Sequence, residues 1–379
     1  MRQVLLTLSF VVAVCGMAWA QAADEAKPAA SNLPGAEYPR VHSDLRVTFR
    51  MTAPGAQKVQ VVPGGSDNGL GKGPFDMKRD ERGVWTVTTP PAMPGFHYYW
   101  LQVDDFACND PSTQTYFGWN KECSGIDVPD KALSFYDVKD VPHGDVRAHW
   151  YYSKTTGMWR RAMVYTPPGY DHDPQTRYPV LYLQHGSGEN ERGWTAQGRA
   201  NFILDNLIAE KKSRPMIIVM ENGMVAPKAG GSPAAKPPAP SRGNAAFAEL
   251  VVNDLVPMID ATYRTIPDRT HRAIAGLSMG AGQATQIGFG NLDKFAYLGA
   301  FSGGGMGRTA AKIDDSKPLL VWMGAGTAEL GCMGSGKTTV EAMNKAGIKA
   351  VWFEAPGTSH EWETWRKCLY DFAPRLFQQ

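Results

Sequence analysis

The sequence predicts a mostly parallel α/β domain preceded by a small all-β sandwich, and three patterns support this prediction. Between residues 41 and 135, short runs alternate apolar and polar side chains, with Gly, Pro and Asp between the runs. From residue 146 to 379, apolar runs alternate with segments of helical length. Gly276–Gly280 then places a serine between a strand and a helix. Period-two alternation is typical of a sandwich, and strand–helix alternation is typical of a parallel sheet covered on both faces.

The composition fits a folded chain of one large domain or two ordinary ones. The 379 residues are 43% hydrophobic and 20% charged, which is enough apolar material for a sizeable core. The 39 basic and 37 acidic residues nearly cancel, so no global field attracts nucleic acid or an anionic membrane. We therefore expect neither of them as a partner.

Residues 1–20 have the features of a signal peptide. Arg2 supplies a positive charge, Val4–Val14 an apolar run, and Ala18–Ala20 a small-x-small cleavage site. The apolar run is shorter than the roughly 20 residues that span a bilayer. We expect a secreted or periplasmic protein that begins near Gln21.

Four cysteines would remain after cleavage, and they form two pairs that are far apart in the sequence. Four cysteines allow three pairings, and local pairing is the simplest choice in an oxidising compartment. We predict the bonds Cys108–Cys123 and Cys332–Cys368, with free thiols in the core as the alternative. A zinc site would need tighter clustering with His, so we expect no metal.

The predicted strands of the sandwich are short, and the last of them is strongly aromatic. They are Val47–Met51, Val59–Val61, Val84–Val87 and Phe96–Val103. A connector at 136–146 follows, and then a hairpin over 148–165 that turns at Thr155-Thr156-Gly157.

The second domain alternates six strands with five helices. The predicted strands are Pro179–Leu183, Met216–Met220, Arg272–Ala275, Ala296–Phe301, Pro318–Met323 and Ala350–Phe353. The predicted helices are Ala200–Glu210, Ala245–Tyr263, Gly280–Gly290, Lys337–Lys345 and Glu361–Phe372. Ala226–Gly243 is rich in Pro, Ala and Gly, which indicates a surface excursion.

The motif Gly276-Leu277-Ser278-Met279-Gly280 predicts a nucleophile elbow, the sharp turn that presents the serine of an α/β-hydrolase fold. The flanking glycines let strand and helix backbones approach closely. A serine in an ordinary structural turn is the alternative.

The partners of Ser278 follow from the chain order Ser, acid, His of this fold class. His360 is the one histidine after Ser278, and it lies in a loop after the last strand. The acid should follow a strand at the same sheet edge, where it would orient the imidazole. We predict Glu329, with Glu354 in reserve.

Two backbone N–H groups should stabilise the tetrahedral oxyanion. We assign them to Met279, which starts the helix after the nucleophile, and to Ser187 in the loop Gln184-His185-Gly186-Ser187-Gly188. His185 is then expected to be a structural hydrogen-bonding residue below the site.

Gly331–Thr338 also satisfies the pattern G-x-x-x-x-G-K-[ST] of phosphate-binding loops. It lies late in the sheet, contains Cys332, and belongs to a chain expected to be exported. We interpret it as a flexible loop that ends at a helix N-terminus, and we expect no nucleotide or other cofactor.

The stretches LYLQHGSGENERGW, AGLSMGAGQA, FSGG, GAGTAEL and PGTSHEWETWRKCLYDFAP resemble family-1 carbohydrate esterases, the feruloyl and acetylxylan esterases of the α/β-hydrolase fold. The N-terminal APGAQKVQVV, GVWTV and PGFHYYWLQVDD are similar to an immunoglobulin-like module of the family-48 carbohydrate-binding type. The resemblance implies Ser278, Glu329 and His360 as the catalytic triad, although many relatives carry Asp where Glu329 stands.

The resemblance also implies a substrate class: feruloylated or acetylated plant cell-wall polysaccharide, from which a feruloyl esterase releases hydroxycinnamic acids. Trp194, Trp362 and Trp365 flank the site and are expected to stack on the aryl group or a xylose. Packing of the last helix onto the sheet is the alternative for Trp362 and Trp365. An acetylxylan esterase, a siderophore trilactone esterase and a non-catalytic carbohydrate-binding protein remain the alternative functions.

Overall fold

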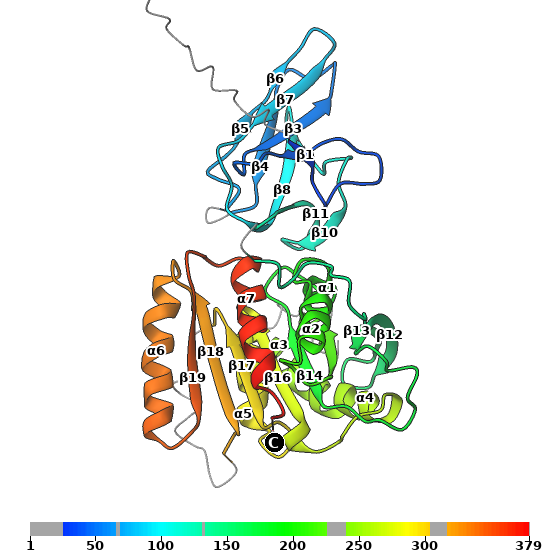
Figure 1. Ribbon diagram of the computed structural model, residues 1–379, viewed down its shortest axis with the longest axis vertical. Helices are drawn as coiled ribbons and strands as arrows, with labels where there is room; N and C mark the ends of the chain where they lie inside the picture. The colour runs from blue at the N-terminus through cyan, green and yellow to red at the C-terminus, as the bar shows by residue number, and fades with distance from the viewer. Residues whose placement is uncertain (1–25, 66–68, 131–132, 226–239, 304–316, 379) are drawn as a thin grey trace, which may run out of the picture.

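The computed structural model describes residues 26–65, 69–130, 133–225, 240–303 and 317–378, which form two lobes stacked along the long axis of the molecule (Figure 1). The upper lobe is an antiparallel β-sandwich, and the lower lobe is a sheet covered by helices on both faces (Figure 1). The predicted signal peptide lies outside the described residues, as does most of the predicted excursion at 226–243.

The sandwich consists of two antiparallel sheets whose inner faces enclose a small core. The first sheet has the order β1(Lys27–Pro28), β2(Arg40–Val41), β3(Val47–Thr52), β7(Val84–Thr88), β6(Lys78–Arg79). The second has the order β10(Thr115–Gly118), β11(Lys121–Val128), β8(Gly95–Val103), β4(Val59–Pro63), β5(Phe75–Asp76), with β9(Phe106–Cys108) paired to β8. The predicted sandwich is confirmed, and its first sheet also contains strands before residue 42.

The lower lobe contains an eight-stranded, mostly parallel sheet, as the alternation of strands and helices predicts. Its order is β12(Asp145–Ser153), β13(Met158–Thr166), β15(Ile217–Glu221), β14(Val180–Gln184), β16(Arg272–Leu277), β17(Tyr297–Phe301), β18(Leu320–Gly326), β19(Ala350–Ala355). The strand β13 is antiparallel to both of its neighbours, β12 and β15, and the turn of the β12–β13 hairpin lies where Thr155-Thr156-Gly157 predicts it. The carboxyl ends of the parallel strands point toward the sandwich (Figure 1).

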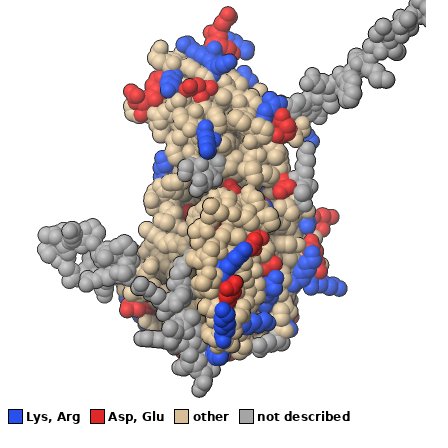
Figure 2. All heavy atoms as spheres, turned by 90° about the vertical axis from the view of Figure 1, so that its left-hand side faces the viewer, with Lys and Arg blue, Asp and Glu red and all other residues tan. Residues whose placement is uncertain are grey.

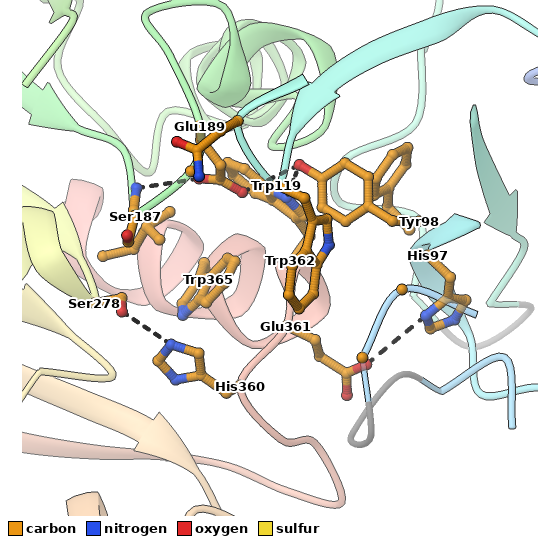
Figure 3. Close-up of a pocket in the computed structure, with 17 residues that line it drawn as sticks. His97, Tyr98, Trp119, Ser187, Glu189, Ser278, His360, Glu361, Trp362 and Trp365 are labelled. Atoms are coloured by element: carbon orange, nitrogen blue, oxygen red, sulfur yellow. Dashed lines mark hydrogen bonds and ion pairs between the residues drawn. The ribbon is translucent and has the colours of Figure 1, made fainter. Parts of the chain in front are cut away.

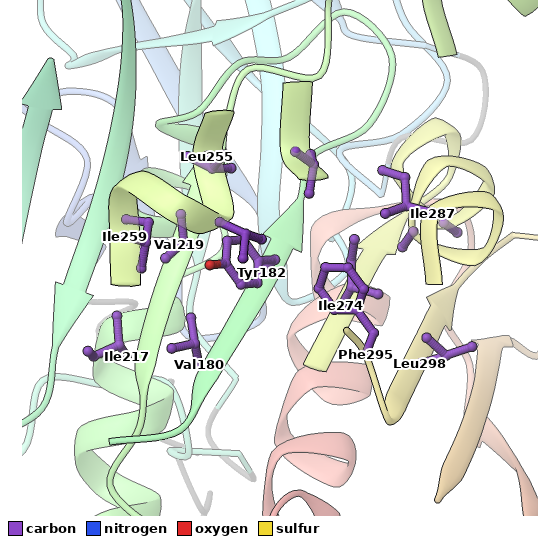
Figure 4. Close-up of a cluster of buried hydrophobic side chains, with 14 of the residues drawn as sticks. Val180, Tyr182, Ile217, Val219, Leu255, Ile259, Ile274, Ile287, Phe295 and Leu298 are labelled. Carbon is purple, nitrogen blue, oxygen red and sulfur yellow. The ribbon is translucent and has the colours of Figure 1, made fainter. Parts of the chain in front are cut away.

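Alternate residues of the central strands face two hydrophobic cores, so both faces of the sheet are covered. On β14, Val180 and Tyr182 face one core, and Leu181 and Leu183 face the other. The first core lies under α3(Pro240–Leu250), α4(Val256–Thr262), α5(Met279–Gly290) and α6(Leu330–Lys345). Figure 4 shows part of this core, where Leu255, Ile259 and Ile287 pack near the strands. The second lies under α1(Gly193–Ala196), α2(Ala200–Ala209) and α7(Trp362–Phe372). Each fully buried Val, Leu, Ile or Phe contributes about 1.5–3 kcal/mol.

The helix α6 begins at Leu330, seven residues earlier than the sequence predicts, so the phosphate-loop pattern Gly331–Thr338 is helical. A phosphate-binding loop needs backbone N–H groups that turn outward around the anion. In α6 most of these groups are used in helical hydrogen bonds. The prediction of a flexible loop here is therefore wrong, and nothing in the geometry supports a phosphate site.

The predicted disulfides are also wrong, because all four cysteines of the described residues are free. Cys108 pairs with Leu101 in register and therefore faces the sandwich core. Ser124 pairs with Tyr99 on that same face, so Cys123 points to the opposite face of the sheet. The two thiols cannot meet without a change of strand register.

In the lower lobe, Cys332 lies in the first turn of α6, and Cys368 is wholly buried in α7. Burial first, and then the Glu329 carboxylate, raise the pKa of both thiols. This keeps them protonated, whereas the thiolate is the form that reacts. Both remain thiols, each close enough to Glu329 to feel its charge.

The two lobes are joined by a buried ion-pair network. The Arg366 guanidinium of α7 donates to both carboxylate oxygens of Asp127 on β11, at 3.1 and 3.0 Å, and Arg199 lies 2.8 Å from the same carboxylate. Burial alone would raise the pKa of Asp127, but the two arginines hold it below its ordinary value. Removing one partner of such a buried pair would leave an uncompensated charge, so the network ties the sandwich to the lower lobe.

Charged side chains of both signs are interspersed on the face that carries α6 (Figure 2). This matches the near balance of basic and acidic residues in the sequence. Among the described residues, no helix combines the length and the apolar character needed to cross a bilayer.

Candidate active site

Ser278 lies on a strained turn between β16 and α5, as the elbow motif predicts. Its backbone has φ 51° and ψ −113°, in the left-handed range of φ that a side chain rarely adopts. Its N–H donates to the Phe301 carbonyl at 2.9 Å, which ties the turn to the neighbouring strand. The sheet thus holds the Ser278 hydroxyl at the edge that faces the sandwich.

The two glycines of the motif are required by close backbone approach. A Cβ at Gly276 would lie 2.4 Å from the Gly280 carbonyl oxygen, and a Cβ at Gly280 would lie 2.4 Å from the His185 carbonyl oxygen. Neither backbone atom can move aside without opening the turn. Both positions therefore exclude a larger residue.

The structure brings Ser278, His360 and Glu329 together. His360 Nε2 lies 3.0 Å from Ser278 Oγ, and His360 Nδ1 lies 3.6 Å from Glu329 Oε2. The Glu329 side chain is only 6% exposed. Glu354, the reserve candidate, instead pairs with Lys337 at 2.6 Å. Ser278 and His360 are thus within hydrogen-bond distance, as nucleophile and base require, and Glu329 lies at ion-pair distance from His360, on the side where an orienting acid acts.

Two further side chains hold the acid in place. Ser302 donates its hydroxyl to Glu329 Oε1 at 2.8 Å, and Trp365 Nε1–H donates to Ser302 Oγ at 3.0 Å. Trp365 also packs edge-on against the His360 ring. One tryptophan therefore positions both the base and the acid.

The predicted oxyanion donors lie beside the Ser278 side chain. Met279 is the first residue of α5, so its N–H has no acceptor within the helix. Ser187 and Ser278 line the same pocket, on the same side of it (Figure 3). His185 is buried, accepts the Gly223 N–H at 2.9 Å and contacts the Gly186 carbonyl, which matches its predicted structural role.

The buried carboxyl of Glu189 forms a hydrogen bond with the oxyanion loop. Glu189 Oε2 accepts the Gly186 N–H at 3.1 Å, and Glu189 Oε1 accepts the hydroxyl of Tyr98, a residue of the sandwich, at 3.1 Å. Tyr98 in turn accepts N–H groups of Gln197 at 2.6 Å and Trp362 at 3.3 Å. Burial raises the pKa of Glu189 to about 7, although these donors oppose the shift.

The pocket in front of Ser278 has a volume of about 560 Å³ and lies between the two lobes (Figure 3). The sandwich contributes Gly64, Gly65 and the turn Trp119-Asn120 to its wall. Asn120 N–H donates to the Gly188 carbonyl at 2.9 Å, so this turn contacts the oxyanion loop directly. The volume is in the range of small-molecule sites.

The three predicted substrate-binding tryptophans differ in position. Trp362 and Trp365 line the pocket, and both also have structural partners. Trp194 is 1% exposed, donates to the Gln184 carbonyl at 2.8 Å and does not line the pocket. Its predicted contact with substrate is wrong, because the core between α1 and the sheet encloses it.

Sequence reasoning missed Glu189, Tyr98, Trp119 and Ser302. Glu189 directly follows the loop quoted for the oxyanion donor, so a carboxyl next to Gly188 was a usable signal. Tyr98 and Trp119 belong to the sandwich, and no local pattern relates them to Ser278. Among the described residues, no group of three His, Cys, Asp or Glu side chains is arranged to hold a metal ion.

Residues 153–376 match the family described as "Putative esterase". The chain belongs to this esterase family. It is 41% identical, over 93% of its length, to an endo-1,4-beta-xylanase/feruloyl esterase of Xylanibacter ruminicola, and it spans 47% of that relative. An esterase of Mycobacterium tuberculosis is 32% identical over 44% of this chain, and the matched part is 33% of that relative's length.

Solved structures agree with this placement. A CE1 ferulic acid esterase of Anaeromyces mucronatus, in complex with ferulic acid, is 27% identical, with 66% of this esterase and 96% of that chain covered and a TM-score of 0.57. The enterobactin esterase of Shigella flexneri, 18% identical, covers 88% of this esterase and 93% of its own chain with a TM-score of 0.64. The second likeness shows the fold alone: an α/β-hydrolase domain preceded by antiparallel β-sheets.

Proposed function

We propose that this esterase is a feruloyl esterase, which releases hydroxycinnamic acids from feruloylated plant polysaccharide through an acyl-enzyme on Ser278. The observation that carries the proposal is the pairing of the Ser278–His360–Glu329 geometry with an aromatic-lined pocket of about 560 Å³. The 41% identity to a xylanase/feruloyl esterase supports the choice of substrate class. Acetylated xylan is the second substrate class to be tested.

The proposed mechanism uses the geometry of the site directly. His360 Nε2 takes the proton from Ser278 Oγ as the hydroxyl attacks the ester carbonyl, and Glu329 stabilises the resulting imidazolium. The N–H groups of Met279 and Ser187 bind the oxyanion. His360 then protonates the leaving sugar alkoxide and activates the water that hydrolyses the acyl-enzyme.

We further propose that the sandwich acts as an accessory module of the carbohydrate-binding type, and that the protein is exported to the periplasm or beyond. The sandwich supplies part of the pocket wall, and the N-terminal sequence has the features of a signal peptide. A polysaccharide substrate would be met outside the cytoplasm.

A kinetic panel tests the proposal. The kcat/KM of methyl ferulate, acetylated xylan and a catecholate trilactone is measured for the wild type and for Ser278→Ala. We expect the highest kcat/KM on methyl ferulate and a loss of several orders of magnitude in the variant. A preference for acetylated xylan or the trilactone, or wild-type turnover by Ser278→Ala, would contradict the proposal.

A further inference from the structure

The pocket has a polar end, formed by Glu361 and His97, on the side away from Ser278 (Figure 3). Glu361 immediately precedes α7, and His97 lies on β8 of the sandwich. Their side chains are 10% and 1% exposed. Between this end and Ser278, three tryptophans line the pocket: Trp119, Trp362 and Trp365.

The two groups that face each other at this end are both hydrogen-bond acceptors. His97 Nε2 lies 2.7 Å from the Met93 carbonyl oxygen, which can only accept, so Nε2 carries the ring proton. Burial lowers the pKa of His97 to about 4, so the ring is neutral at neutral pH and Nδ1 keeps a free lone pair. Glu361 Oε2 faces this nitrogen at 3.9 Å.

This arrangement lacks a donor. Glu361 Oε1 accepts the Ser359 N–H at 3.1 Å, but the buried Oε2 has no hydrogen-bond partner among the described residues. The 3.9 Å between Oε2 and His97 Nδ1 is too long for a hydrogen bond between them. Buried polar atoms are normally paired, so an orphan acceptor at a pocket wall points to a ligand group that donates.

We propose that Glu361 and His97 bind the phenolic hydroxyl of the substrate's acyl group, so that the sandwich takes part in selecting the substrate. This inference rests on the proposed function, in which the pocket accepts a hydroxycinnamoyl ester. The aryl ring lies among the tryptophans, and its hydroxyl donates to Glu361 Oε2 or His97 Nδ1. A sugar hydroxyl has the same donor chemistry, and the experiment distinguishes the two sources.

The test compares methyl ferulate with methyl 3-methoxycinnamate, which lacks the hydroxyl and adds no bulk. A hydrogen bond to a charged acceptor corresponds to a preference of about 10- to 100-fold in kcat/KM. We expect this preference in the wild type and in the control Glu354→Gln, whose carboxylate pairs with Lys337 outside the pocket wall. The ratio of the two substrates cancels any effect on His360, which the two reactions share.

The informative variant is Glu361→Gln. Because the Ser359 N–H requires an acceptor, the amide oxygen takes the place of Oε1, and the amide nitrogen faces His97 Nδ1. The variant therefore supplies the missing donor itself. We expect the preference for the phenol to fall to about one, while the thermal midpoint stays at or above that of the wild type.

Three results would overturn the inference. The first two are a wild type that does not prefer the phenol and a Glu361→Gln variant that keeps the preference. A third is a Glu361→Gln variant that loses rate only on feruloylated arabinose and not on methyl ferulate, because the hydroxyl bound would then be the sugar's. If neither methyl ester is hydrolysed by the wild type, the proposed function itself is wrong, and the inference falls with it.

Discussion

Glu189 should make the activity fall as pH rises through about 7, and Glu189→Gln should remove this fall. The carboxyl lies directly beneath the oxyanion loop, where it accepts the Gly186 N–H. Burial raises its pKa to about 7. The group is therefore neutral below this pH and becomes an anion above it, next to the site where a second negative charge develops in the reaction.

The size of the effect follows from the geometry. A Cβ placed at Gly186 would lie 3.4 Å from Glu189 Oε2 and 3.6 Å from Ser278 Cβ, so these two atoms are at most 7 Å apart. Taking about this distance for the separation between the carboxylate and the oxyanion that forms next to Ser278, the two like charges repel by about 2 kcal/mol at an effective dielectric constant of about 20. This corresponds to a decrease of about 30-fold in kcat/KM.

The assay is kcat/KM for methyl ferulate in the wild type and Glu189→Gln, from about two units below to about two units above this pKa. The variant keeps an acceptor for the Gly186 N–H, so the hydrogen bond to the oxyanion loop is preserved. The ratio of variant to wild type at each pH compares the site without and with the Glu189 charge. The ratio should rise by about 30-fold with pH. A ratio that does not change with pH would refute the reasoning.

The remaining predictions concern the stability of the protein and the state of its cysteines, both of which depend on buried groups. Asp127→Asn leaves Arg366 buried without its charge partner. Chemical denaturation should therefore show a loss of about 3–5 kcal/mol in the free energy of unfolding. An unchanged free energy would mean that this ion pair does not hold the two lobes together. Burial raises the pKa of both Glu189 and Glu221 to about 7, so the stability they contribute is fully present below their ordinary pKa near 4.5 and is lost as pH rises through about 7. Glu189→Gln should flatten that decline in thermal melts, and an identical decline would exclude Glu189. Alkylation of the unreduced, denatured protein should label all four cysteines of the described chain, whereas a Cys332–Cys368 crosslink would contradict the free thiols.

The elbow and the base could be predicted because their signals are local. Ser278 lies in a five-residue motif between a recognisable strand and helix, and His360 is the one histidine that follows it. Glu329 required one more step, the rule that the acid follows a strand at the same sheet edge. These predictions depend on chain order and strand ends, which the sequence displays directly.

The start of α6 could not be predicted, because packing overrides local preference there. The segment 331–336 contains three glycines, which disfavour a helix. At Gly336 a Cβ would lie 2.0 Å from the ring of Trp352, so the missing side chain lets the helix pack on that residue. Gly336, which by its intrinsic propensity favours a loop, is therefore the point at which the helix packs on Trp352.

The contribution of the sandwich was also hidden from the sequence. Tyr98 and Trp119 reach the site through the docking of two lobes, and docking leaves no periodic signal along the chain. Trp194 shows the opposite case: it lies beside the oxyanion loop in the sequence, yet its indole is enclosed in the core. Its nearness to the loop in sequence therefore led to a wrong prediction of substrate contact.

The central claim is that Ser278 carries a feruloyl group during turnover. Intact-mass spectrometry of the esterase, acid-quenched during hydrolysis of a feruloyl ester, followed by peptide mapping, tests it most directly. We expect one added feruloyl group per chain, located on Ser278 and absent from Ser278→Ala. Hydrolysis without any acyl-enzyme in either burst-phase or steady-state samples, or an acyl group on another residue, would contradict the account.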